Sequence, residues 1–386
     1  MIQRSACVFF RLLSRAPAPP SSKARACYYG TQATSSLQEA CESSIYSRTE
    51  DEYAGVDWDN LGFGLVQTDY MYMMRCGRDE EFKQGQLSRY GNIELSPSAG
   101  VLNYGQVHVL SGGDDRKLKH KGFQKDDGGL FLFRPQENAI RMQIGAQRMC
   151  MPCPSVEQFL DAVKQTALAN RRWIPPAGKG SLYIRPLLMG SGSVLGLAPA
   201  SEYTFLVYAS PVGNYFKEGT AALNLYVEDE FHRAARGGAG GIKSITNYAP
   251  VLKAIARARD RGFSEILYLD SVNKRNIEEG NILSTPATNG TILAGVTRKS
   301  IIDIAHDLGY EVEERSIPIE ELINADEVFC TGTAVGVAPV GSITYKGNRV
   351  EYKTSTQLVS QKLYSRLTGI QRGIIKDSQG WVVEID

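Results

Sequence analysis

One short segment joins an unusually flexible backbone to a single lysine. Gly237-Gly-Ala-Gly-Gly241 places four glycines in five positions, and Lys243 follows between Ile242 and Ile245. Glycine permits backbone geometries that other residues resist. A lysine among apolar neighbours can have a lowered pKa, which is what a Schiff-base nucleophile needs. Lys243 is therefore the candidate nucleophile of the chain.

Two other interpretations of this segment stay open from the residues alone. It nearly matches the phosphate-loop pattern GxxxxGK[ST], but Ile242 separates the last glycine from Lys243, which disfavours a nucleotide triphosphatase. The segment is also compatible with a flexible surface loop that carries a solvated lysine.

The bulk composition indicates a soluble protein of two domains. A chain of 386 residues is long enough for two domains that each bury a core. Its hydrophobic content of 42% and its charged content of 22% are those of a globular protein. No apolar run approaches the roughly 20 residues that span a bilayer, so we expect no membrane association.

The N-terminal residues differ in charge from the rest of the chain. The first 38 residues contain no acid, because Glu39 is the first acidic residue. The remaining residues hold 38 basic and 42 acidic side chains, so the body of the protein lacks the basic excess that nucleic-acid binding usually needs. The basic residues of the N-terminal segment are Arg4, Arg11, Arg15, Lys23 and Arg25.

An N-terminus rich in Arg, Ser and Ala and poor in acids is typical of an organellar transit peptide. We assign residues 1–45 to such a peptide and a linker. The mitochondrial matrix is favoured over the chloroplast because basic residues outnumber Ser and Thr in the first 25 positions. A secretory signal is disfavoured because arginines interrupt the apolar stretch around Phe9.

Cysteines and histidines do not suggest a metal site. Cys150 and Cys153 have CxxC spacing, but no second CxxC or nearby histidine pair completes a zinc site, and two reduced thiols in a loop are expected. The histidines are scattered along the chain at His108, His120, His232 and His306.

The pattern of apolar residues and turns predicts two α/β domains with a cleft between them. Ser155 and Gln158 form a capping box that opens a helix. We expect a smaller N-terminal domain over 53–212, a link over 213–219 and a larger domain over 220–386. The other expected elements are strands over 181–188, 203–208 and 266–269, and helices over 250–261 and 298–308 that end at Gly262 and Gly309.

Two further turns contain the small and hydroxyl-bearing residues that suit an anion. Residues 290–297 lead into an expected helix, whose first N–H groups and dipole favour a phosphate, although an ordinary threonine cap is the alternative. Cys330-Thr-Gly-Thr-Ala334 follows a strand and offers amides and hydroxyls. Arg141 could add charge to the same phosphate.

Several motifs occur together in a fixed order along the chain. They are Asn60-Leu-Gly-Phe63, Leu102-Asn-Tyr-Gly-Gln106, Leu132-Phe-Arg-Pro135, Tyr183-Ile-Arg-Pro186, Glu202-Tyr-Thr-Phe205, Lys243, Asn247-Tyr248, Thr285-Pro-Ala-Thr-Asn-Gly290 and Thr331-Gly-Thr-Ala334. From about residue 53 to the C-terminus, this order resembles that of the plant branched-chain amino acid aminotransferases.

The resemblance implies a two-domain α/β (α+β) protein of fold-type IV, D-amino acid aminotransferase-like, with pyridoxal 5'-phosphate between the two domains and a homodimeric assembly. It implies that Lys243 forms the Schiff base and moves the substrate proton. Tyr248 would hydrogen-bond the phenolic oxygen of the cofactor, and Glu279 would keep its pyridine nitrogen protonated. The implied phosphate contacts are Arg141, Val296, Thr297 and Thr333, and the implied substrate contacts are Tyr104, Tyr183, Arg185, Thr333 and Ala334.

The implied reaction is reversible transfer of the amino group of leucine, isoleucine or valine to 2-oxoglutarate, which gives the 2-oxo acids and glutamate. One alternative is a relative with the same fold, such as a D-amino acid aminotransferase or aminodeoxychorismate lyase, which the Tyr183-Ile-Arg185 motif disfavours. Another is a catalytically impaired isoform.

Two segments depart from the family pattern. After Gln106 the strand that walls the pocket is replaced by the basic, glycine-containing residues 107–124, which as a buried strand would place Lys and Asp against an apolar core. After Glu279 about ten residues, including an apolar strand, are absent. We therefore expect either a displaced Glu279 or an exposed sheet edge, and reduced activity.

Overall fold

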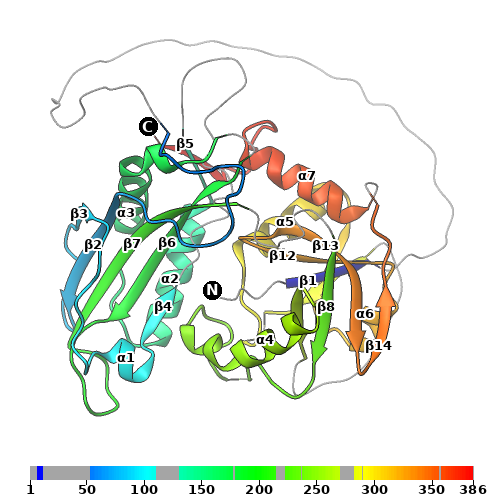
Figure 1. Ribbon diagram of the computed structural model, residues 1–386, viewed down its shortest axis with the longest axis horizontal. Coiled ribbons are helices and arrows are strands. Elements are labelled where there is room, and N and C mark those ends of the chain that lie inside the picture. The colour runs from blue at the N-terminus through cyan, green and yellow to red at the C-terminus, as the bar shows by residue number, and fades with distance from the viewer. Residues whose placement is uncertain are drawn as a thin grey trace, which may run out of the picture.

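The computed structural model describes most of the chain, and the described residues form two lobes (Figure 1). They are residues 7–11, 53–109, 130–176, 179–213, 222–235, 237–269, 282–288, 290–355 and 358–385.

The first lobe is built on a five-stranded antiparallel sheet in the order β3-β2-β7-β6-β4. The two longest strands pair along their whole length, and nearly all their residues are buried. The elements of this lobe are β2 (Tyr70–Gly77), β3 (Gln86–Arg89), α1 (Gly100–Tyr104), β4 (Val107–Val109), α2 (Pro135–Arg148), α3 (Val156–Ala169), η1 (Arg171–Trp173), β6 (Ser181–Gly190) and β7 (Glu202–Val212).

Helix α3 covers one face of this sheet and begins at the predicted capping box. The Ser155 hydroxyl accepts a hydrogen bond from the Gln158 N–H at 3.2 Å, and the Gln158 side chain accepts one from the Ser155 N–H at 2.9 Å. These two bonds satisfy donors that the first helical turn would otherwise leave open. Phe159 on the buried side of α3 packs against Phe205 of β7.

The opposite face of the sheet turns toward the second lobe. Met71, Val107 and Leu206 form an apolar cluster there, and Ile245 of the second lobe packs against it. The segment that carries Lys243 therefore lies against the first-lobe sheet.

The second lobe contains an eight-stranded mixed sheet in the order β11-β10-β1-β12-β13-β8-β9, with β14 paired to β13. Its strands are β1 (Cys7–Arg11), β8 (Leu223–Glu228), β9 (Glu265–Tyr268), β10 (Ile282–Pro286), β11 (Glu311–Arg315), β12 (Glu327–Gly332), β13 (Gly336–Tyr345) and β14 (Asn348–Glu351). Its helices are η2 (Ile245–Asn247), η3 (Ala249–Val251), α4 (Leu252–Asp260), α5 (Val296–Asp307), α6 (Ile319–Ile323) and α7 (Val359–Gln371).

The C-terminus returns to the first half of the chain. Strand β15 (Val382–Ile385) pairs antiparallel with β5 (Leu130–Phe133) as a separate two-stranded sheet. Trp381, just before β15, contacts Phe133 edge-on with ring centroids 5.8 Å apart.

Strand β1 lies where the sequence led us to expect an open edge. It pairs antiparallel with β12 along all five residues and with β10 at Phe10 and Arg11. The facing edge of β12 is thus paired at residues 327–331, and that of β10 at Leu283 and Ser284, so the edge expected as one of two alternatives is partly covered. Glu279 lies outside the described residues, as does most of the link expected over 213–219.

The expected elements are confirmed, with shifted boundaries. The helix expected over 250–261 begins as η3 and continues as α4, and the turn at Gly262 has the positive φ of 84° that favours glycine. Helix α5 begins at Val296, two residues earlier than expected. Of the departing segment 107–124, the structure describes 107–109, which form the buried strand β4 and contain no Lys or Asp; the other residues lie outside the described part. Within the described residues, no helix is both long and apolar enough to cross a membrane.

Candidate active site

The glycine-rich segment brings Lys243 close to a second turn. A Cβ atom on Gly240 would lie 2.9 Å from the carbonyl oxygens of Gly290 and Thr291, so only glycine permits this approach. The contact packs the backbone before Lys243 against the segment that leads into α5. The turn that carries Lys243 and the turn over residues 290–297, which was expected to bind an anion, are therefore neighbours.

Lys243 is buried inside this turn. Its side chain is 3% exposed, and its Nζ donates a hydrogen bond to the Tyr248 hydroxyl at 3.0 Å. The Asn247 amide donates to the carbonyls of Ala239 and Ile242 at 2.7 and 2.9 Å, which closes the loop around the lysine. The interpretation as a solvated surface lysine is wrong, because the amine is held in the interior.

Strand β4 of the first lobe contacts Lys243 from the other side. The Lys243 N–H donates to His108 Nε2 at 3.3 Å, and the Val109 N–H donates to the Lys243 carbonyl at 3.0 Å. Sequence reasoning grouped His108 with the scattered histidines and missed this contact. No local pattern could have revealed it, because the two residues lie 135 positions apart.

The start of α5 has the features of an anion site. Gly295 occupies the cap position without a side-chain cap, and Thr297 lies inside the first turn, so the alternative of a threonine cap is wrong. The Thr297 side chain is 1% exposed, and its hydroxyl has no hydrogen-bond partner among the described residues. The first turn contains no acid. A buried orphan hydroxyl beside unpaired helical N–H groups fits a phosphate.

The other predicted contacts lie on α2 and on the turn between β12 and β13. Arg141 lies on α2, and its charge lowers the pKa of His108. Thr333 and Ala334 form the tight turn between β12 and β13. Within the described residues, no cluster of three or more His, Cys, Asp or Glu side chains could hold a metal. The expected free thiols are present at Cys150 and Cys153.

Two predicted substrate residues lie together on β6. Arg185 donates to the Tyr183 hydroxyl at 3.0 Å, and its guanidinium carbon lies 5.0 Å from the centre of that ring. Both side chains are buried, and the Nε of Arg185 has no hydrogen-bond partner among the described residues. A buried guanidinium with an unused donor suits a carboxylate.

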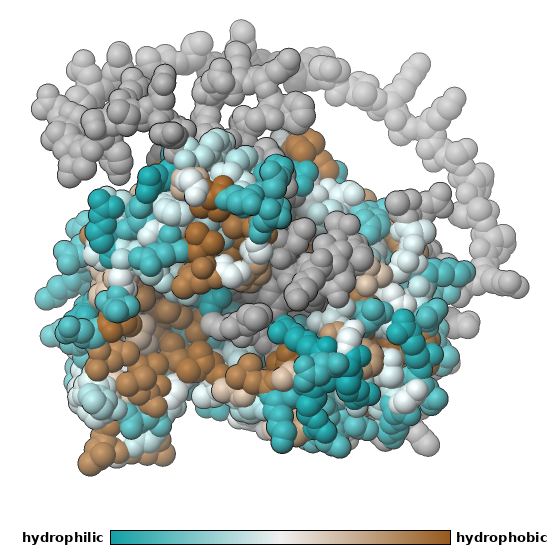
Figure 2. All heavy atoms as spheres, in the orientation of Figure 1, coloured by the Kyte–Doolittle hydropathy of each residue, from teal (hydrophilic) through white to brown (hydrophobic). Residues whose placement is uncertain are grey.

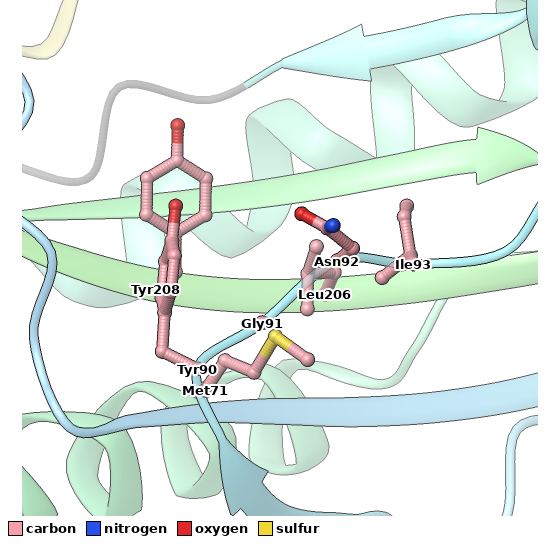
Figure 3. A pocket seen from close by; sticks show the side chains of 7 residues that line it. All are labelled: Met71, Tyr90, Gly91, Asn92, Ile93, Leu206 and Tyr208. Atoms are coloured by element: carbon pink, nitrogen blue, oxygen red, sulfur yellow. The ribbon is translucent and has the colours of Figure 1, made fainter.

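An open hollow of about 500 Å³, lined by both polar and apolar groups, lies on the same sheet (Figure 3). Tyr208 lines it and stands opposite Arg185 in the sheet register, and burial raises the pKa of the Tyr208 hydroxyl. The remaining lining residues are Met71, Tyr90, Gly91, Asn92, Ile93 and Leu206. The Tyr104 hydroxyl, at the end of α1, donates to the Leu195 carbonyl in the loop between β6 and β7.

Comparison with known proteins agrees with this arrangement. The family model "Amino-transferase class IV" matches residues 126–343. The chain is 63% identical over 368 residues to the chloroplastic branched-chain amino acid aminotransferase 2 of Arabidopsis thaliana, covering 93% of each chain. It is 61% identical over 364 residues to the mitochondrial branched-chain amino acid aminotransferase 1 of Humulus lupulus, covering 92% of this chain and 90% of that one.

Solved structures show the same fold. The branched-chain amino acid aminotransferase of Escherichia coli superposes with a TM-score of 0.67 at 25% identity, over 83% of this chain and 100% of that chain. A Thermus enzyme solved with pyridoxamine 5'-phosphate superposes with a TM-score of 0.65 at 24% identity, over 82% of this chain and 99% of that chain.

Replacing Thr297 by Val should test the anion site at the start of α5. The change keeps the shape and removes one hydroxyl, so binding of pyridoxal phosphate should weaken by about 1–2 kcal/mol, one hydrogen bond to a charged group. Equilibrium titration of the cofactor measures the effect. Thr368→Val, which removes an exposed hydroxyl from α7, is the matched control. Equal affinity in both variants would show that the Thr297 hydroxyl does not contact the phosphate.

Proposed function

The chain belongs to the class IV aminotransferase family, whose branched-chain members are pyridoxal phosphate enzymes. From this premise we propose that it exchanges amino groups between leucine, isoleucine or valine and 2-oxoglutarate. The observation that carries the proposal is the buried pair of Lys243 Nζ and Tyr248 Oη, which lies in the turn packed against the approach to α5. The relatives named above act on branched-chain amino acids by name.

Each of the predicted residues has a proposed part in holding the cofactor. Lys243 would hold it covalently and carry the proton that leaves the substrate. Tyr248 would hydrogen-bond its phenolic oxygen, and Glu279 would keep its ring nitrogen protonated. The phosphate contacts would be Val296, Thr297, Arg141 and Thr333. When bound, pyridoxal phosphate supplies an aldehyde that accepts the amino group and a ring that withdraws electrons.

The site can also recognise both ends of a branched-chain substrate. The unused Nε of Arg185 offers a donor for the carboxylate, and Tyr183 fixes the guanidinium by its hydroxyl. Within the hollow, the side chains of Met71 and Leu206 offer apolar contacts on the same sheet face for an aliphatic side chain. Thr333, Ala334 and Tyr104 complete the proposed set of substrate contacts.

A homodimer of two-domain subunits is the proposed assembly, with domains over 53–212 and 220–386 joined by 213–219. The loop between β6 and β7 supports it, because Leu195 and Leu197 are 92% and 89% exposed. Figure 2 shows apolar surface at the lower end of the first lobe, where this loop lies. Exposed leucines at a loop tip favour burial against a second copy of the chain.

The relatives carry chloroplastic or mitochondrial names, so an organellar location is indicated. We place the chain in the mitochondrial matrix on the charge of its first 38 residues. A fluorescent protein fused to residues 1–45 should enter mitochondria, since cations without acids favour the negative matrix side. The same fusion with its five basic residues changed to Gln is the control. Signal from plastids alone, or from the cytosol, would contradict the placement.

Borohydride reduction of the protein loaded with pyridoxal phosphate should fix the pyridoxyl group on Lys243, because this amine is buried beside Tyr248. Peptide mapping by mass spectrometry locates the label. The exposed Lys253 serves as control, and Lys253→Arg should leave the label in place. Label on another lysine would refute the assignment. Label on Lys243 without leucine-dependent glutamate formation would identify an impaired isoform.

A further inference from the structure

Strand β4 satisfies both backbone polar groups of Lys243. The N–H donates to His108 Nε2, the carbonyl accepts from the Val109 N–H, and His108 forms an antiparallel bridge with Ser244. An unpaired backbone N–H at a buried residue such as Lys243 would destabilise the fold. The His108 side chain of the first lobe thus supplies the hydrogen-bond acceptor for the backbone N–H of Lys243 in the second lobe.

The contacts of the His108 ring favour its neutral form and fix its position beside α2. Because Nε2 accepts a hydrogen bond, the ring is neutral and its proton lies on Nδ1. Burial, and after it the charges of Arg141 and Lys243, together lower the pKa of His108 to about 3. Helix α2 leaves room for the ring only at Gly145, where a Cβ would lie 1.9 Å from Cδ2 of His108.

We propose that His108 is a positioning residue for Lys243. By accepting a hydrogen bond from the Lys243 N–H, this side chain of the first lobe fixes the position of the lysine backbone in the second lobe. The inference rests on the proposed role of Lys243. A protonated imidazole could not accept this hydrogen bond, and its charge would be repelled by Arg141 on α2 and by Lys243. The position therefore requires a neutral ring.

Two variants of the full chain, each loaded with pyridoxal phosphate, separate the hydrogen-bonding role of His108 from the effect of its protonation. His108→Leu removes the acceptor, so the Lys243 amide should exchange its hydrogen about tenfold faster. His108→Gln keeps an acceptor at similar reach and should restore slow exchange. Mass-spectrometric hydrogen exchange of the peptide around Lys243 measures both, and His306→Gln, at an exposed histidine of α5, is the matched control.

The pH dependence of unfolding gives the second readout. Below about pH 6.5 the unfolded chain protonates this histidine while the folded chain does not, so stability falls as the pH falls toward 3. As the pH falls from 6 to 4, protonation of His108 in the unfolded chain should raise the unfolding equilibrium constant of the wild type by an extra factor of about ten per pH unit. Both His108 variants should lack this extra rise. Unchanged exchange in His108→Leu, or an unchanged pH slope in His108→Gln, would overturn the inference. Neither readout depends on turnover, so a chain that fails to transaminate does not count against it.

A different observation, the sheet order, carries a second inference. Strand β1 is the hydrogen-bonded connection between β10 and β12, with Phe9 opposite Phe329 and Phe10 opposite both Val328 and Ser284. Without it, β10 and β11 would form a separate pair, and two sheet edges would lose their partners. The geometry points to residues 7–11 as a structural strand of the folded protein, although the sequence assigns them to the import leader. Removal of the leader beyond Arg11 would then remove an interior strand.

Hydrogen exchange on the full chain tests this strand directly. Amides of residues 7–11 should exchange at least about tenfold more slowly than in a synthetic peptide of residues 1–20. Phe10→Pro removes a ladder donor and should lower the melting temperature, whereas Ala24→Pro, outside the strand, should not. Exchange as fast as in the free peptide, or equal melting temperatures for the two proline variants, would refute the role.

Discussion

The site depends on one contact between two backbones, that of Gly240 with the carbonyls of Gly290 and Thr291. Any side chain at Gly240 would separate the two segments, because a Cβ would already lie 2.9 Å from both oxygens. The approach places the turn of Lys243 beside the chain that enters α5. An amine and an orphan hydroxyl from distant parts of the sequence thereby share one region.

The features that the sequence predicted, in the fold and near Lys243, are those with local causes. Lys243 and Tyr248 are five residues apart, so one short turn brings them together. The capping box at Ser155 works within four residues and was confirmed in both of its bonds. The start of α5 was predicted from a glycine and a threonine in sequence, and only the position of Thr297, inside the turn and not before it, differed.

The parts that escaped prediction depend on pairing between remote segments. His108 has no motif, and its importance comes from a hydrogen bond to the backbone of a residue on the other lobe. Tyr208 and Arg185 lie opposite each other only because β6 and β7 pair in one register. Strand β1 joins a sheet whose other members begin more than 200 positions later. Such partners follow from tertiary structure, for which a single sequence carries no local signal.

The two segments that are expected to depart from the family pattern raise different structural demands. Residues 107–109 form a buried strand, in which apolar Val107 and Val109 flank His108. The His108 side chain is accommodated because Gly145 leaves space for the ring. The sequence predicts that a strand is missing after Glu279, and no side-chain change could replace its row of backbone hydrogen bonds. Only another extended segment can satisfy the edges of β10 and β12, which is why the N-terminal residues, antiparallel to both, complete this sheet.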